Sequence, residues 1–203
     1  MNLKYLVLCS IGNEARIKNV EKLKEQIPEL EVVMCGRDTV FQEHIKAFDI
    51  EDKYDGIIIL EDDVQLCKDF KTRAAVLVEE HKNEVVSMFE SACSRGELKS
   101  EYRPGRNFAW NQCNYYPKQI CRVLAAPDML PKFKEYFYTK LHEVWNYPID
   151  RYIAFVLGMY KIKYYMSVPF LVQHLPMKSN FKGRPINRQS RYFIDDMEGK
   201  SDV

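Results

Sequence analysis

The chain has 203 residues, of which 46% are hydrophobic and 29% are charged. This composition is typical of a folded globular protein and excludes a disordered or fibrous chain, while the length suits one domain better than two. The formal net charge of +1 provides no overall field that would attract nucleic acid or an acidic membrane. Any such contact would need a local patch.

The cysteines and the apolar segments bear on the cellular compartment. The 6 cysteines include no C-x-x-C pair, and several lie within apolar runs. We interpret them as buried, reduced thiols. The N-terminal apolar run ends too early for a signal peptide, and no window approaches the roughly 18 apolar residues of a membrane span. The sequence predicts a cytoplasmic protein, with no transmembrane segment and no evident obligate protein partner.

The first half of the chain alternates between strand and helix. The apolar runs predict strands at residues 3–10, 31–35, 56–60 and 84–89. Apolar residues at helical spacing predict helices at residues 14–26, 39–48 and 69–82. Repeated βαβ units of this kind favour an α/β fold with a mostly parallel central sheet flanked by helices.

The second half is less regular. Residues 91–110 are polar and contain glycine and proline, which indicates a flexible loop that could act as a lid. Further along we predict strands at 119–125 and 160–166, helices at 127–140 and 148–158, and a short apolar run at 170–174. We expect one domain over residues 1–175, with a nucleotide-binding half to about residue 90 and an acceptor half after it. The tail, 176–203, would close over the site or be partly mobile.

Three acidic residues follow the most apolar strand. Ile57 to Leu60 read as a strand buried on both faces, and Glu61, Asp62 and Asp63 come directly after it. Strand alternation would place Glu61 and Asp63 on one side and Asp62 on the other. Crowded carboxylates repel one another unless a cation neutralises them, and Mg²⁺ or Mn²⁺ held by carboxylates and substrate phosphates is a common solution. A solvated turn or a helix cap is the alternative reading.

The strand end Leu60-Glu61-Asp62-Asp63-Val64 resembles the D-x-D-type motif of GT-A-fold glycosyltransferases, in the "LEDD" form of the lipopolysaccharide-type enzymes. Arg16 after the first strand, Pro148-Ile-Asp150 and Pro169 to His174 are similar to further segments of those enzymes, in the same order. The glycine-serine-histidine string of that family is not matched, because only Gly36, Gln42 and His44 stand in its place. The resemblance implies a single GT-A-like, Rossmann-type domain and a metal-dependent glycosyltransferase that uses a nucleotide-sugar, with a UDP-sugar as the first candidate.

The resemblance also implies roles at the donor site. Asp63 and His174 would bind the metal, and Glu61 or Asp62 would hold the ribose or the sugar. Phosphate oxygens would meet the loop at Lys178 and Ser179, and Arg16 would contact base or phosphate. Each has a plainer alternative, since His174 could be satisfied by backbone and Lys178 or Arg16 could be solvated.

Asp150 is the candidate catalytic base. In an inverting reaction a carboxylate takes the proton of the acceptor hydroxyl as the new bond forms. The alternative is that Asp150 caps a helix, or only positions the acceptor in a retaining reaction.

The acceptor is inferred from residues 103–122 and the tail, where cations alternate with aromatic residues. Such residues can stack on bases and meet phosphates. The candidate nucleic-acid or acceptor residues are Arg106, Trp110, Tyr115, Tyr116 and Arg184. Compact sugar transferases of this size resemble phage-encoded enzymes that glycosylate hydroxylated pyrimidines, so DNA is the first expectation. The same resemblance implies the cytoplasm of a bacterial or phage-infected host cell. A lipopolysaccharide or other glycan acceptor is the second, and a non-catalytic nucleotide- or nucleic-acid-binding module is the third.

Overall fold

A computed structural model describes residues 1–36, 39–89, 99–108, 113–140, 149–177 and 193–195. Its central feature is a seven-stranded sheet in the order β2-β1-β3-β7-β5-β8-β6. These strands are β1 (Leu3–Ser10), β2 (Glu31–Cys35), β3 (Gly56–Glu61), β5 (Val85–Ser87), β6 (Glu101–Pro104), β7 (Cys113–Pro117) and β8 (Lys163–Met166). A second, two-stranded sheet pairs β4 (Val64–Leu66) with β9 (Val172–His174).

The central sheet is mainly parallel, since all of its strands except β6 and β7 run in the same direction. β1 pairs in parallel with β2 and β3, and β5 pairs in parallel with β8. β7 is antiparallel to both of its neighbours, β3 and β5, and β6 is antiparallel to β8. The predicted α/β class, with a mostly parallel sheet flanked by helices, is therefore confirmed.

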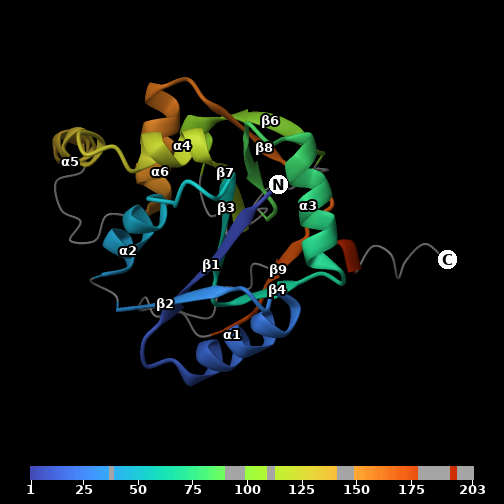
Figure 1. Ribbon diagram of the computed structural model, residues 1–203. Helices are drawn as coiled ribbons and strands as arrows, with labels where there is room; N and C mark the ends of the chain where they lie inside the picture. The colour runs from blue at the N-terminus through green and yellow to red at the C-terminus, as the bar shows by residue number, and fades with distance from the viewer. Residues whose placement is uncertain (37–38, 90–98, 109–112, 141–148, 178–192, 196–203) are drawn as a thin grey trace.

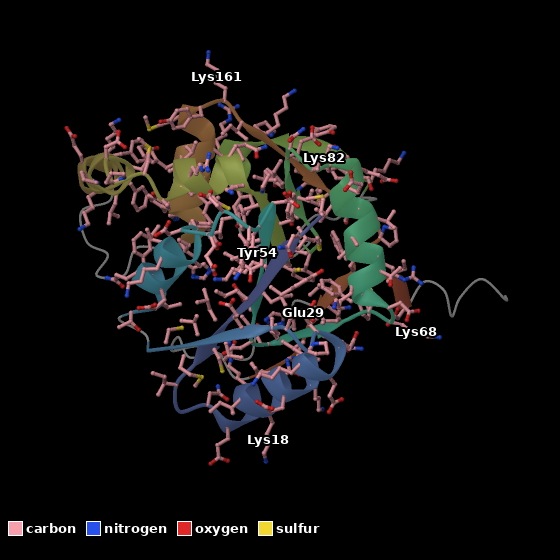
Figure 2. The ribbon with its side chains drawn as sticks, in the orientation of Figure 1. Lys18, Glu29, Tyr54, Lys68, Lys82 and Lys161 are labelled. Carbon is pink, nitrogen blue, oxygen red and sulfur yellow. The ribbon has the colours of Figure 1, made fainter. Side chains whose placement is uncertain are left out.

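Helices and charged side chains surround this sheet. The helices are α1 (Glu14–Gln26), α2 (Val40–Ala47), α3 (Phe70–Glu80), α4 (Lys118–Leu124), α5 (Met129–Lys140) and α6 (Ile149–Met159), with a 3₁₀ helix, η1 (Gly105–Asn107). In Figure 1, α2, α4, α5 and α6 lie together to the left of the central strands, and α3 lies to the right. Lys18, Lys82 and Lys161 project outward at the edge of the molecule (Figure 2). No helix within the described ranges is long and apolar enough to cross a membrane.

The middle of the sheet is the hydrophobic core. Ile57, Ile58, Ile59 and Leu60 of β3 are each at most 5% exposed, as expected for a strand covered on both faces. Gly56 begins this strand where Tyr115 crosses it, and a Cβ atom there would lie 2.4 Å from Cε2 of Tyr115. The five cysteines within the described ranges, Cys9, Cys35, Cys67, Cys113 and Cys121, are free and buried, in agreement with the expected reduced thiols.

Two segments of the second half differ from the sequence-based expectation. Residues 119–125 were expected to form a strand, but α4 covers most of this segment, and the strand, β7, lies just before it. The segment 91–110, expected to be a loop, contains β6 and η1, because pairing with β8 orders part of it. Residues 90–98 and 109–112 lie outside the described residues.

Candidate functional site

The three acidic residues form a turn at the carboxyl end of β3, and we call Glu61, Asp62 and Asp63 the acidic turn. Strand β3 ends at Glu61, and β4 begins at Val64. Asp62 and Asp63 form the turn between the two strands. The side chains of Asp62 and Asp63 both form ion pairs with Arg16. The expected placement of Asp62 on the side opposite Asp63 is therefore wrong, because the strand geometry that it assumes stops at Glu61.

Arg16 reaches the acidic turn from the first turn of α1. The side chain of Asn13 caps this helix by accepting a hydrogen bond of 3.3 Å from the backbone N–H of Arg16. The two guanidinium nitrogens of Arg16 then donate separately, Nη1 to Asp62 and Nη2 to Asp63. The Arg16 side chain is only 11% exposed, so this is a buried pairing of one cation with two carboxylates.

Asp62 is fully engaged by protein donors. Besides Arg16, its carboxylate accepts a 2.7 Å hydrogen bond from the backbone N–H of Ser10 at the end of β1. The side-chain amide of Asn19 in α1 donates to the backbone carbonyls of Asp62 and Val64, at 3.1 and 2.8 Å. Asp62 and Asn19 thus tie β1, α1 and the end of β3 together.

Asp63 has a different environment, shared with His174. His174 lies in β9 opposite Val64, and its Nε2 is 3.4 Å from Oδ2 of Asp63. The backbone carbonyl of Asp63 also accepts a 2.8 Å hydrogen bond from Leu175. Burial acts to raise the pKa of Asp63, but the hydrogen bond from His174 and the charge of Arg16 outweigh it, so the pKa lies below its ordinary value. Asp63 is therefore ionised at neutral pH.

The predicted metal ligands, Asp63 and His174, do lie together. Oδ1 of Asp63 and Nδ1 of His174 are buried, and neither has a hydrogen-bond partner among the described residues. A buried carboxylate oxygen of this kind suits a hard cation that takes its remaining ligands from substrate phosphates. In the described part of the chain, no group of three or more His, Cys, Asp and Glu side chains is arranged to hold a metal alone. Asp63 and His174 would therefore supply two of the ligands that a metal needs, and the others would have to come from a bound substrate.

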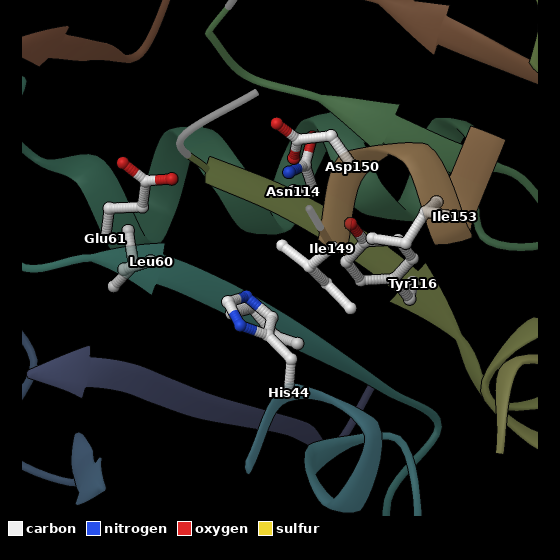
Figure 3. A pocket seen from close by; sticks show the side chains of 9 residues that line it. His44, Leu60, Glu61, Asn114, Tyr116, Ile149, Asp150 and Ile153 are labelled. Atoms are coloured by element: carbon white, nitrogen blue, oxygen red, sulfur yellow. The ribbon is translucent and has the colours of Figure 1, made fainter. Parts of the chain in front are cut away.

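Next to the acidic turn is a small cavity, which we call the His44 cavity (Figure 3). Four structural elements enclose it: α2, β3, β7 and the first turn of α6. Its lining residues are His44, Ile59, Leu60, Glu61, Asn114, Tyr116, Ile149, Asp150 and Ile153. Glu61 lies at the boundary, since it belongs to both the acidic turn and the cavity wall.

Glu61 and Asp150 face the same space. Figure 3 shows the two carboxyl groups pointing toward the cavity from β3 and α6. Burial raises the pKa of Glu61 well above its ordinary value, and the nearby charges of Asp63, Asp150 and Asp62 raise it further, with Arg16 opposing them. Two carboxyl groups that interact electrostatically across a cavity can share a proton and transfer it to or from a ligand.

The remaining predicted site residues are dispersed or buried. Tyr115 is fully buried and donates to the carbonyl of Lys82, so the expectation that it stacks on an acceptor at the surface is corrected. Tyr116 is also buried but lines the His44 cavity. Arg106 is exposed on η1. The predictions for Trp110, Lys178, Ser179 and Arg184 lie outside the described residues.

Two residues of the site were not predicted from the sequence. His44 belongs to a segment that matches the family motif poorly, and the sequence expectations do not include Asn19. Asn19 shares the buried face of α1 with Val20 and Leu23, and a polar residue on an otherwise apolar helix face is the signal that could have identified it. His44 has no such pattern, because α2 and α6 become neighbours of the cavity only in the folded chain.

No protein-family model and no curated protein matches the sequence. Among solved structures, the chain is similar to residues 1–349 of S. aureus TarS, at 13% identity and a TM-score of 0.42, over 83% of this chain and 61% of that one. It is also similar to a longer S. aureus TarS structure, at 15% identity and a TM-score of 0.42, over 82% of this chain and 36% of that one. The chain thus spans less than two thirds of either TarS chain. A TM-score of 0.42 is too low to establish a common fold or function.

Proposed function

We propose that this protein is a metal-dependent glycosyltransferase that moves a sugar from a nucleotide-sugar, with a UDP-sugar as the first candidate, to an acceptor hydroxyl. One observation carries the proposal. Asp63, with a buried oxygen that no described residue binds, lies beside Arg16 at the carboxyl end of β3, next to a cavity that contains Glu61 and Asp150. The carboxyl ends of strands in an open α/β sheet are where such folds bind nucleotides.

The donor diphosphate would bind at Asp63. Asp63 and His174 would hold Mn²⁺ or Mg²⁺, and the ion, when bound, would neutralise charge that develops on the leaving diphosphate. Arg16 lies against the same carboxylate and can turn one guanidinium N–H toward a phosphate oxygen. These residues would therefore orient the leaving group.

Asp150 would act on the acceptor. In an inverting transfer, the acceptor oxygen forms a bond to the anomeric carbon, the bond from that carbon to the diphosphate breaks, and Asp150 receives the hydroxyl proton. Asp150 lies on the wall of the same cavity as Glu61, which belongs to the acidic turn, and this position supports the assignment. Glu61 would contact the sugar or the ribose rather than the metal, because its side chain points into the cavity.

For the acceptor, we propose a hydroxylated or hydroxymethylated pyrimidine of DNA. This acceptor is supported by the cationic and aromatic composition of residues 103–122 and by the exposure of Arg106 within that segment. The burial of Tyr115 removes one of the stacking residues on which this reading depended. A glycan acceptor is the other outcome that the assay below distinguishes.

A thermal-shift panel of nucleoside diphosphates with Mn²⁺, Mg²⁺ or chelator tests the donor site. A ligand at about a hundred times its Kd adds roughly 2.7 kcal/mol to the native state, which corresponds to roughly 5 to 10 °C in a domain of this size. We expect this gain with UDP and Mn²⁺, and we expect the near-isosteric Asp63→Asn variant to lose it. No gain with any nucleotide and metal would contradict the proposal and favour a non-catalytic module.

Incubation with nucleotide-sugars tests the reaction and its acceptor. Hydroxymethylated DNA, plain DNA and oligosaccharides are offered in parallel, and products are read as nucleoside or glycan masses. We expect sugar on hydroxymethylated DNA only, and none with Asp150→Asn. Transfer to oligosaccharide but never to DNA would retain the enzyme class and overturn the acceptor.

A further inference from the structure

His44 brings a lone-pair acceptor to the cavity. Its Nδ1 is 3.3 Å from the backbone carbonyl of Val40, one turn earlier in α2. A carbonyl oxygen only accepts hydrogen bonds, so Nδ1 must carry a ring proton. Burial lowers the pKa of His44 to about 4, although the hydrogen bond to Val40 opposes this. At neutral pH the ring therefore holds one proton, on Nδ1, and Nε2 keeps its lone pair.

The free nitrogen faces the cavity. In a histidine ring Nε2 is farther from the main chain than Nδ1, and Nδ1 is held against α2 by its bond to Val40. Figure 3 shows the His44 ring at the cavity wall, below Leu60 and beside Ile149. A ligand in the cavity therefore meets a nitrogen that can accept a hydrogen bond but cannot donate one.

The rest of the lining indicates the class of ligand. Glu61 and Asp150 contribute carboxyl oxygens, which accept hydrogen bonds from hydroxyl groups, and the space beside them is too small for a carboxylate or a phosphate. Apolar side chains complete the wall, supplied by Ile59, Leu60, Ile149 and Ile153. The cavity has a volume of about 20 Å³, which is room for about one hydroxyl group, so a sugar ring would lie at its mouth with one hydroxyl inside and its C–H face against the apolar side chains.

We infer that Nε2 of His44 accepts a hydrogen bond from a hydroxyl of the transferred sugar, and that the His44 cavity selects a neutral sugar over one that bears a carboxylate or a phosphate. The inference rests on the proposed function, and it assigns the sugar and the diphosphate to different parts of the site. The diphosphate belongs to the side of Arg16 and Asp63, and the sugar belongs to the side of His44 and Asp150.

Calorimetric titration with three probes tests the inference. UDP, UDP-glucose and UDP-glucuronate are titrated with Mn²⁺ into the wild-type protein, His44→Phe and His44→Gln. Phenylalanine keeps a ring but removes the acceptor, whereas the amide oxygen of glutamine can replace Nε2. We expect His44→Phe to weaken the binding of UDP-glucose by roughly 3- to 10-fold, the effect of one neutral hydrogen bond, and to leave the binding of UDP unchanged. His44→Gln should bind both ligands about as tightly as the wild type does. We also expect the wild type to bind UDP-glucuronate more weakly than UDP-glucose.

The outcomes separate this inference from the proposed function. If UDP binds but UDP-glucose is insensitive to His44→Phe, or if UDP-glucuronate binds best, the role of His44 is refuted while the donor site stands. If none of the three probes binds the wild type, the proposed UDP-sugar activity fails and this inference fails with it. If His44→Phe weakens the binding of UDP and of UDP-glucose equally, the role of His44 is also refuted, because the substitution then acts on the whole site.

A measurement on the wild-type protein covers the case in which His44→Phe does not fold. Long-range proton–nitrogen NMR spectra report which ring nitrogen of each histidine is protonated, and the signal missing from His44→Gln identifies His44. We expect an unprotonated Nε2 whose resonance moves when UDP-glucose is added but not when UDP is added. A proton on Nε2 in the free protein would overturn the inference.

Discussion

Arg16 donates a hydrogen bond from Nη2 to the carboxylate of Asp63 and, at the same time, another from Nη1 to the carboxylate of Asp62. The pairing joins the first turn of α1 to the end of β3, 46 and 47 residues apart in the chain. A cation is therefore built into the acidic turn by the fold itself, and a metal ion at Asp63 would be the second positive charge there rather than the first.

Removing that cation should be costly. Arg16→Gln leaves two nearly buried carboxylates without their counter-charge, and breaking a buried ion pair on one side typically costs about 3 to 5 kcal/mol. We expect a loss of this size in the free energy of unfolding, measured by urea denaturation. Arg122→Gln is the matched control, since Arg122 pairs with Asp52 at the surface, where both side chains are at least 70% exposed, and should cost less than about 1 kcal/mol. Equal effects of the two substitutions would show that the Arg16 pairing contributes nothing special.

Asn19 should be required for the shape of the acidic turn. Asn19→Ala removes the donor for the backbone carbonyls of Asp62 and Val64, and an unsatisfied buried acceptor costs about 1 to 3 kcal/mol. The exposed amide of Gln119, which donates to Asn83, is the control, and Gln119→Ala should change stability by less than about 0.5 kcal/mol. Chemical denaturation measures both, and an Asn19→Ala protein as stable as the wild type would contradict this role.

Gly56 should not tolerate a side chain. A Cβ there would lie 2.4 Å from Tyr115 and 2.7 Å from the backbone oxygen of Tyr116, so β3 and β7 would have to separate. Overpacking of this kind costs about 1 to 3 kcal/mol. Gly36→Ala is the control, because the nearest atom there, Oγ1 of Thr39, is 3.9 Å away. The melting temperatures of the two variants should differ clearly, and similar values would indicate that the strands adjust freely.

The half-buried, neutral His44 predicts a pH dependence of stability. The unfolded chain takes up this proton near pH 6.5, and the folded protein does so only near pH 4. Between these values the unfolded state binds more protons, so stability is present above pH 6.5 and is lost as the pH falls toward 4. We expect His44→Gln to remove roughly 1 to 3 kcal/mol of that loss. Denaturation curves at pH 7.5, 5.5 and 4.5 measure it, and parallel behaviour of the two proteins would show that His44 titrates normally.

The sequence predicts the first half of the fold well, because its signals are local. Leu3–Ser10 and Glu31–Cys35 are mostly apolar, and the helix between them has clear periodicity, so all three bounds agree with the structure. The error at residues 119–125 has the opposite origin. Ile120, Val123 and Leu124 favour a strand on composition, but the neighbouring strand β3 is already paired by Cys113–Pro117. Tertiary pairing decided between two plausible segments.

The site was predicted in its parts but not in its geometry. Asp63 and His174 were expected together, and they lie together, although metal binding itself stays a prediction. The pairing of both aspartates with Arg16 could not be read from strand alternation, since it depends on where β3 ends. His44 could not be found either, because its importance comes from the tautomer that Val40 imposes and from the helix that faces it.

The antiparallel strand β7 has a consequence for how the chain is made. It lies between β3 and β5, yet it begins 26 residues after β5 ends, at Cys113 against Ser87. The nascent protein therefore displays one bare edge of β3 until Cys113–Pro117 leaves the ribosome. That edge carries Ile57 to Leu60, a short stretch of high β propensity and no charge, which is the kind of segment that seeds aggregation. A truncated chain ending near residue 90 should therefore be insoluble, whereas a chain that includes α4 would have this edge covered.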